Sequence, residues 1–217
     1  MANSQTNTTP LQAGRIQRHR LADRIYHWVM AVAVLILLGS SLLPILGWKF
    51  AWLDLHWITG LVLTIAVLFH IVRALGWQNF WAMMVDGQDM RDVLGGSANK
   101  PGKYTLAQKL YHLAVSVLIL AGIGTGLVML RKIDTPFWNR DPYWFSDQGW
   151  GVIYAVHGFV AMALVTMIMI HVYFALRPDE WRLTRSMFRG WITSKEYRDH
   201  HDPKRWQAGE EAAKKEA

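Results

Sequence analysis

VIYAVHGFVAMALVTMIMIHVYFAL, residues 152–176, is the stretch that decides the fold. It contains no Asp, Glu, Lys or Arg, and only two histidines, His157 and His171, could carry charge near neutral pH. A helix of this length, rising 1.5 Å per residue, is long enough to cross the ~30 Å hydrocarbon core of a bilayer. The stretch therefore predicts a transmembrane helix.

Three further apolar runs lie at residues 28–47, 55–75 and 110–130 of the 217-residue chain. Each is about twenty residues long and almost free of charge at its centre, as a transmembrane helix requires. Buried helices of a soluble bundle are the alternative, but four such runs in one chain favour a membrane. The sequence predicts an all-α integral membrane four-helix bundle.

Four segments follow from this reading. Residues 1–17 are polar and are expected to form a disordered arm, and residues 18–177 the transmembrane domain. In residues 178–206, aromatic side chains follow one face of a helix and arginines follow another. This pattern predicts an amphipathic helix on the cytoplasmic leaflet, followed by a tail. The aromatic face holds Trp181, Phe188 and Trp191, and the basic face Arg182, Arg185 and Arg189. Residues 207–217 are expected to form a disordered tail.

The net charge of +7 reports topology rather than affinity for nucleic acid. The two ends of the chain and the segment between the second and third runs hold 19 of the 23 Lys and Arg residues, counting Arg73 at the end of the second run. Because cytoplasmic segments carry the excess of Lys and Arg, both termini and the middle segment are expected in the cytoplasm. The chain is then expected to be a multi-pass membrane protein with both termini on the cytoplasmic side.

Cysteine is absent from the chain. This excludes disulfides, thiolate zinc sites, iron–sulfur clusters and covalent CxxCH attachment of haem. A redox centre in this chain must be held by histidine, methionine or carboxylate.

The spacing of His157 and His171 predicts two stacked metal centres. Fourteen residues correspond to roughly 1,400°, close to four full turns, so both side chains share one helix face. The same spacing gives a rise of ~21 Å, which places one histidine near each membrane surface. Two haems stacked across the bilayer, each with one axial imidazole from this helix, match the geometry. A proton relay would need closer steps, and a zinc site would need converging ligands.

The partners of these two histidines follow from their depth. Near the outer surface, His56 is the remaining histidine, and it is expected to pair with His157. Near the inner surface, three histidines lie at the depth of His171, and spacing does not choose among them: His27, His70 and His112. His19, His200 and His201 are expected to be solvated or interfacial.

Seven short motifs lie around the histidines and in the tail: Asp23-Arg-Ile-Tyr-His27-Trp28, His56-Trp-Ile-Thr-Gly60, Gln108-Lys109, His157-Gly158, His171-Val-Tyr-Phe174, Gly190-Trp191-Ile192 and His200-His201-Asp202-Pro203-Lys204-Arg205-Trp206. They resemble motifs of the cytochrome b (gamma) subunits of membrane-bound formate dehydrogenases. The resemblance covers about residues 18–206, and its tail motif is interrupted here by Asp202 and Lys204. That family lies within a wider dihaem cytochrome b group serving nickel–iron hydrogenases and thiosulfate reductases, which implies a location in a bacterial inner membrane.

The resemblance implies two haem b groups and favours His27 over His70 and His112 as the second inner ligand. The implied axial ligands of haem iron are His27, His56, His157 and His171. Electrons are expected to come from a periplasmic iron–sulfur subunit and a catalytic molybdenum or tungsten oxidoreductase subunit, and to reach quinone at the cytoplasmic side. Catalysis then belongs to another subunit, and assembly into a higher oligomer is compatible with this role.

The segment Gly102-Lys-Tyr-Thr-Leu-Ala-Gln-Lys109 resembles a family segment that lines the quinone pocket. Tyr104, Gln108 and Lys109 match it, whereas Thr105 replaces Asn and Ala107 replaces Gly. The resemblance implies that Thr105, Ala107 and Gln108 contact menaquinone or ubiquinone. A capped helix start without a ligand is the alternative interpretation.

Residues 131–151 contain six aromatic side chains, which predict a docking surface for an outer partner or a membrane-interface belt. The nearest functional alternatives are a hydrogenase or thiosulfate-type partner and a stand-alone quinone-linked cytochrome b. A haem-free anchor or transporter is the alternative of another class.

Overall fold

The computed structural model describes residues 14–76, 80–95 and 100–208. Four of its helices are long and apolar enough to cross a membrane: α1 (Leu21–Leu42), α2 (Trp52–Gly76), α4 (Leu106–Met129) and α5 (Asp147–Leu176). They confirm the predicted helical membrane fold. Helices α1 and α5 begin several residues before their apolar runs, because backbone hydrogen bonding continues into polar residues past the hydrocarbon boundary.

The chain divides into two compact units. The helical unit comprises Ile25–Phe80 and Leu110–Tyr173, and the terminal unit takes the described residues of Met1–Arg24, Trp81–Lys109 and Phe174–Ala217. Short 3-10 turns join several elements: η1 (Phe80–Met83), η2 (Leu130–Lys132) and η3 (Pro178–Glu180).

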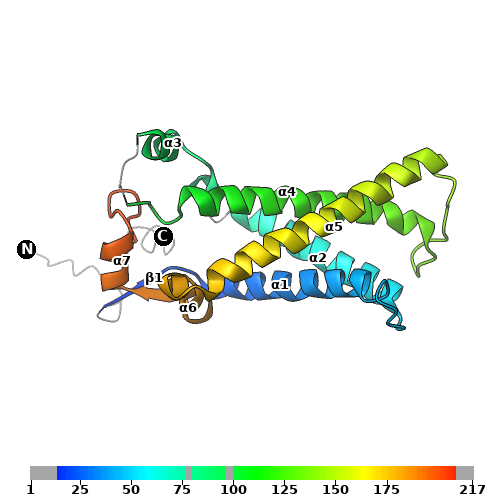
Figure 1. The fold of residues 1–217 in the computed structure, drawn as a ribbon, viewed down its shortest axis with the longest axis horizontal. Coiled ribbons are helices and arrows are strands. Elements are labelled where there is room, and N and C mark those ends of the chain that lie inside the picture. Colours follow the sequence, from blue (N-terminus) through cyan, green and yellow to red (C-terminus); the bar gives the residue numbers. More distant parts are fainter. Residues whose placement is uncertain (1–13, 77–79, 96–99, 209–217) are drawn as a thin grey trace, which may run out of the picture. The chain divides into compact units, whose positions relative to one another are not determined.

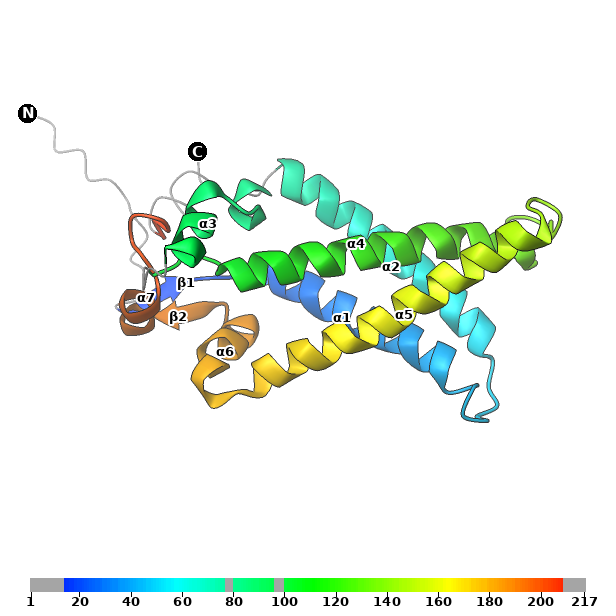
Figure 2. The ribbon, with the colours of Figure 1, turned by 45° about the horizontal axis from the view of Figure 1, so that its top comes forward.

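The core of the helical unit is contributed by all four long helices, which lie side by side in Figures 1 and 2. Most other apolar side chains on these helices are exposed; Ile65 and Met169 are each 68% exposed. Apolar side chains on the outside of apolar helices are what a hydrocarbon solvent favours. The buried core residues are Ala33, Leu63, Val67, Ile119, Val160 and Leu164.

The connection between α4 and α5 is held by aromatic and cationic contacts. Trp150 is 2% exposed, and its indole Nε1 donates to the Pro142 carbonyl at 2.8 Å. The Lys132 ammonium lies 4.8 Å from the centroid of the Trp150 ring, and the Asp141 amide donates to the Arg131 carbonyl. One end of this long loop is therefore packed rather than free.

The terminal unit contains a small sheet and three short helices. Strand β1 (Arg15–Gln17) pairs antiparallel with β2 (Trp191–Thr193), as Figure 2 shows. The helices are α3 (Gly87–Leu94), α6 (Trp181–Arg189) and α7 (Ser194–His200).

Two boundaries differ from the sequence expectations. The arm expected to be disordered to residue 17 ends in strand β1, because Arg15–Gln17 finds backbone partners in β2. The amphipathic helix ends at Arg189 rather than continuing through Trp191. Gly190 has φ +87°, and a Cβ there would meet the His19 carbonyl oxygen at 2.9 Å. Residues 1–13 and most of the expected tail, 209–217, lie outside the described residues.

Candidate metal centres

Four histidines of the helical unit form two pairs. The His56 ring on α2 and the His157 ring on α5 have centroids 6.2 Å apart, with an interplanar angle of 72°. The His27 ring on α1 and the His171 ring on α5 have centroids 6.1 Å apart, at 47°. Helix α5 thus contributes one histidine to each pair, near opposite ends of its span.

Both separations fit two imidazoles on a single metal ion. Metal–imidazole nitrogen bonds are about 2 Å long, and the ring centroid lies about 1 Å behind the nitrogen, so two trans ligands have centroids about 6 Å apart. Among the described residues, no group of three or more His, Cys, Asp or Glu side chains is placed to hold a metal. A pair without further protein ligands fits haem iron, because the macrocycle supplies the remaining donors.

Hydroxyl groups contact the Nδ1 atoms of the His56–His157 pair. Ser40 Oγ lies 2.9 Å from His56 Nδ1, and Thr125 Oγ1 lies 2.8 Å from His157 Nδ1. A Cβ at Gly126 would lie 3.4 Å from His157 Cε1, so the bare glycine lets α4 lie directly against this ring. The sequence analysis did not identify Ser40 and Thr125. Residue spacing within one helix does not show that a hydroxyl faces a histidine of another helix.

The two alternative partners of His171, His70 and His112, have surroundings that differ from those of His27. The His70 ring stacks on Tyr26, with centroids 4.4 Å apart and planes at 9°. His112 is half-buried on α4, one residue after Tyr111, whose ring stacks on His171 at 5.6 Å. The structure therefore brings His27 to His171 and gives His70 an aromatic neighbour.

The start of α4 is a reciprocal cap. Thr105 Oγ1 accepts from the Gln108 backbone N–H at 3.2 Å, and Gln108 Oε1 accepts from the Thr105 backbone N–H at 3.1 Å. This is a capping box, in which two side chains satisfy backbone donors that the first helical turn leaves open. Thr105 and Gln108 are half-buried, and Ala107 is exposed. The Gln108 NH₂ group takes no part in the box.

Lys109 lies beside this box and is buried rather than at a lipid surface. Its ammonium pairs with Asp89 at 2.6 Å and with Asp86 at 3.3 Å. Asp89 also pairs with Arg205 at 3.0 Å, and Arg205 with Asp92 at 2.8 Å. This ion-pair network joins α3, the start of α4 and the C-terminal segment within the terminal unit.

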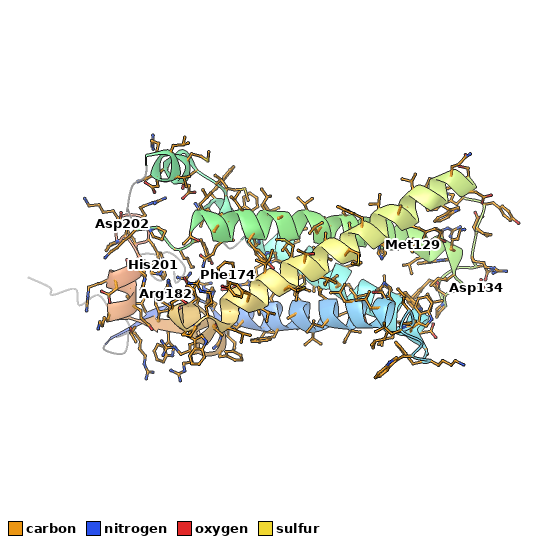
Figure 3. All side chains as sticks on the ribbon, viewed as in Figure 1. Met129, Asp134, Phe174, Arg182, His201 and Asp202 are labelled. Atoms are coloured by element: carbon orange, nitrogen blue, oxygen red, sulfur yellow. The ribbon has the colours of Figure 1, made fainter. Side chains whose placement is uncertain are left out.

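His201 is buried in the terminal unit, which corrects the expectation that it is solvated. Its Nδ1 lies 2.7 Å from the Gly102 carbonyl, so this nitrogen donates, and its Nε2 accepts from Arg18 at 3.1 Å. Burial is the largest cause that lowers the pKa of His201 to about 4, and the neighbouring cations Arg18 and Arg182 act in the same direction. His201 and Arg182 are labelled in Figure 3. Arg18 also donates to the Lys103 carbonyl at 2.8 Å. His201 of the tail motif therefore connects the C-terminal segment to Arg18 and to Gly102 through hydrogen bonds.

Comparison with known proteins matches this chain to membrane cytochromes. A family model described as prokaryotic cytochrome b561 matches residues 18–190. The chain is 26% identical over 127 residues to the formate dehydrogenase cytochrome b556(fdo) subunit of Escherichia coli K12, covering 58% of this chain and 53% of that protein. It is 25% identical over 217 residues to the formate dehydrogenase cytochrome b556 subunit of Haemophilus influenzae, covering 93% and 86%. The chain thus spans about half the length of the first of these relatives.

Proposed function

The chain belongs to the prokaryotic cytochrome b561 family, and from this membership we propose that it is the membrane-anchoring cytochrome b subunit of a formate dehydrogenase. In this role it carries electrons from a periplasmic iron–sulfur subunit, through two b haems, to quinone at the cytoplasmic side. The catalytic molybdenum or tungsten site lies on another subunit. Both curated relatives described above are named as formate dehydrogenase cytochrome subunits.

The pairing of four histidines is the observation that carries the proposal. His56 with His157, and His27 with His171, would hold one haem b each through Nε2. Haem b, when bound, supplies reversible one-electron chemistry at its iron. Because both α5 histidines belong to one continuous helix, the separation of the two sites is set by the rigid helical rise of ~21 Å.

The periplasmic partner is assigned to the surface around the α4–α5 connection. Tyr143 is 90% exposed and Phe137 is 72% exposed, while the loop that carries them is held by the Trp150 and Arg131 contacts. Exposed aromatics on an ordered loop are typical of protein interfaces. The excess of Lys and Arg at both ends of the chain and in the middle segment puts this loop on the opposite, periplasmic side.

Quinone is assigned to the start of α4. The Gln108 NH₂ group supplies a donor for a quinone carbonyl, while its Oε1 keeps the helix capped. Ala107 offers a small, exposed neighbour to a flat ring. A binding site of this kind needs few polar groups and an apolar slot.

The proposal is tested by purifying the tagged chain from its native membrane without denaturation. The expected result is a reduced-minus-oxidised spectrum of b-type haem, copurification of an iron–sulfur subunit and a molybdenum or tungsten subunit, and reduction of the haem by formate. Copurification of a hydrogenase and reduction by hydrogen would reassign the partner. A preparation without haem would sink the cytochrome assignment itself.

A further inference from the structure

Two hydroxyl groups in the helical unit lie within hydrogen-bond distance of Nδ1 of His56 and of His157. Ser40 is 2% exposed, and its Oγ lies 2.9 Å from His56 Nδ1 and 3.0 Å from the Leu37 carbonyl oxygen. Thr125 Oγ1 lies 2.8 Å from His157 Nδ1 and 2.7 Å from the Ala121 carbonyl oxygen. Thr125 Oγ1 also lies 3.2 Å from the Gly122 carbonyl oxygen. Each hydroxyl therefore has one histidine nitrogen and at least one carbonyl oxygen as neighbours, and one proton to donate.

The position of that proton determines the tautomer of each histidine. A carbonyl oxygen only accepts, so the hydroxyl must donate its proton to Leu37 or Ala121; otherwise two acceptor oxygens would face each other at 3.0 Å or less. The hydroxyl oxygen then accepts from the imidazole, which puts the ring proton on Nδ1. The lone pair of each ring is left on Nε2, the nitrogen available to a metal.

We propose that Ser40 and Thr125 are positioning residues for the metal ligands His56 and His157. They hold each ring in the Nδ1–H tautomer and make Nε2 a stronger donor. The imidazole Nδ1–H donates to the hydroxyl oxygen, and the hydroxyl donates to the carbonyl oxygen. In such a hydrogen-bond chain each bond polarises the next. A more basic imidazole stabilises ferric over ferrous iron and so lowers the reduction potential of the centre it ligates. This inference rests on the proposed function, because it takes the His56–His157 pair to hold haem.

The second histidine pair is built differently. Among the described residues, His27 Nδ1 is buried and has no hydrogen-bond partner. The His27 ring therefore lacks the hydroxyl support that both rings of the His56–His157 pair have. This asymmetry favours electron residence at the His27–His171 pair over the His56–His157 pair.

Matched variants isolate the role of the hydroxyl. Ser40→Ala and Thr125→Val remove the acceptor, whereas Thr125→Ser keeps it. Ser41→Ala and Thr64→Val are controls, because these hydroxyls also donate to carbonyls of their own helices, those of Leu38 at 2.9 Å and Gly60 at 2.8 Å. The controls thus remove a helix-bonded hydroxyl without touching His56 or His157.

The readouts are an optical redox titration and the electron paramagnetic resonance spectrum of the ferric protein. Ser40→Ala and Thr125→Val should each shift one of two redox steps upward and alter one of two low-spin signals, while Thr125→Ser and the controls match the wild type. Loss of one haem in Thr125→Val but not in Thr125→Ser would also support positioning. Unchanged potentials and spectra, or equal shifts in the controls, would overturn the inference.

Failure of this inference is distinguishable from failure of the proposed function. If the wild type binds two haems and His56→Ala removes one of them, but Ser40→Ala and Thr125→Val titrate like the wild type, only the positioning role is wrong. If the wild type itself shows no haem, the proposed function is wrong as well.

Discussion

Histidines on three helices meet in two pairs, and each pair depends on side chains that come from different parts of the chain. His157 and His171 share α5, while His56 comes from α2 and His27 from α1. A ring–ring separation near 6 Å in both pairs matches the spacing expected for two imidazoles on one metal ion. Single substitutions therefore test the pairing directly.

His56→Ala and His157→Ala should each remove the same haem. Loss of either axial imidazole leaves a site with one protein ligand, while the other pair is untouched. Optical spectra and potentials of the remaining haem should then be the same in both variants. Loss of different haems in the two variants would refute the pairing.

His27→Ala and His70→Ala should differ sharply. His27 faces His171, so its loss should bleach one haem. His70 stacks on Tyr26, so its loss should cost about 1–2 kcal/mol of packing and hydrogen-bonding free energy and leave the spectrum intact. If His70→Ala bleaches the haem and His27→Ala does not, His70 is the ligand.

At the scale of single elements, the first turn of α4 has a structural role and is also the site proposed for quinone. The Thr105–Gln108 box uses the backbone amides and the Gln108 oxygen, and the Gln108 NH₂ group is outside it. The capped-helix interpretation of this segment is thus compatible with a quinone contact rather than an alternative to it. Two substitutions of Gln108 distinguish the capping role from the quinone contact.

Gln108→Leu should weaken both the cap and the quinone contact, whereas Gln108→Glu should keep the box and lose only the donor. Loss of one hydrogen bond is worth roughly 1–3 kcal/mol, or about five- to 150-fold in apparent quinone affinity, and should appear in both variants. Steady-state quinone kinetics and inhibitor titrations measure it. Normal kinetics in Gln108→Glu would leave only a capping role.

The C-terminal segment should loosen as pH falls. His201 has a pKa lowered to about 4 by burial, below its ordinary 6.5, so the unfolded segment binds a proton that the folded one excludes. The stabilisation is complete above pH 6.5 and is lost as pH falls toward 4, by roughly 2 kcal/mol between pH 7 and pH 5.

Hydrogen exchange of the α7 amides measures this loosening. Exchange in the wild type should accelerate at pH 5 beyond the intrinsic pH dependence. His201→Gln is the matched variant, because its amide can both donate to Gly102 and accept from Arg18 without titrating. An equal pH response in His201→Gln would assign the effect to other groups.

At the scale of the whole molecule, the prediction is two haem b groups per chain. Two histidine pairs, one toward each end of the α5 span, provide two sites with nearly equal ring separations, 6.1 Å and 6.2 Å. Pyridine haemochrome analysis against protein concentration should return a value close to two. A value near one would contradict the dihaem arrangement, whatever partner the chain has.

The four membrane helices, the exclusion of cysteine-based centres and the family resemblance could all be deduced from the sequence. Each depends on composition or on spacing within one helix, such as the apolar length of residues 152–176 or the fourteen residues between His157 and His171. Helical periodicity makes these local properties. Spacing alone did not choose a partner for His171, since His27, His70 and His112 are expected at the same depth. The family resemblance favoured His27, and the structure brings the His27 and His171 rings to 6.1 Å.

Contacts between distant segments were decided by the tertiary structure. Arg15–Gln17 was expected to be disordered and pairs with β2, and His201 was expected to be solvated and is buried against Arg18. Ser40 and Thr125 meet His56 and His157 only because their helices pack at one particular rotation. A polar residue gives no local sign of its acceptor when that acceptor lies on another element. Spacing along one helix therefore determined where the histidines lie, and packing between helices determined what each of them faces.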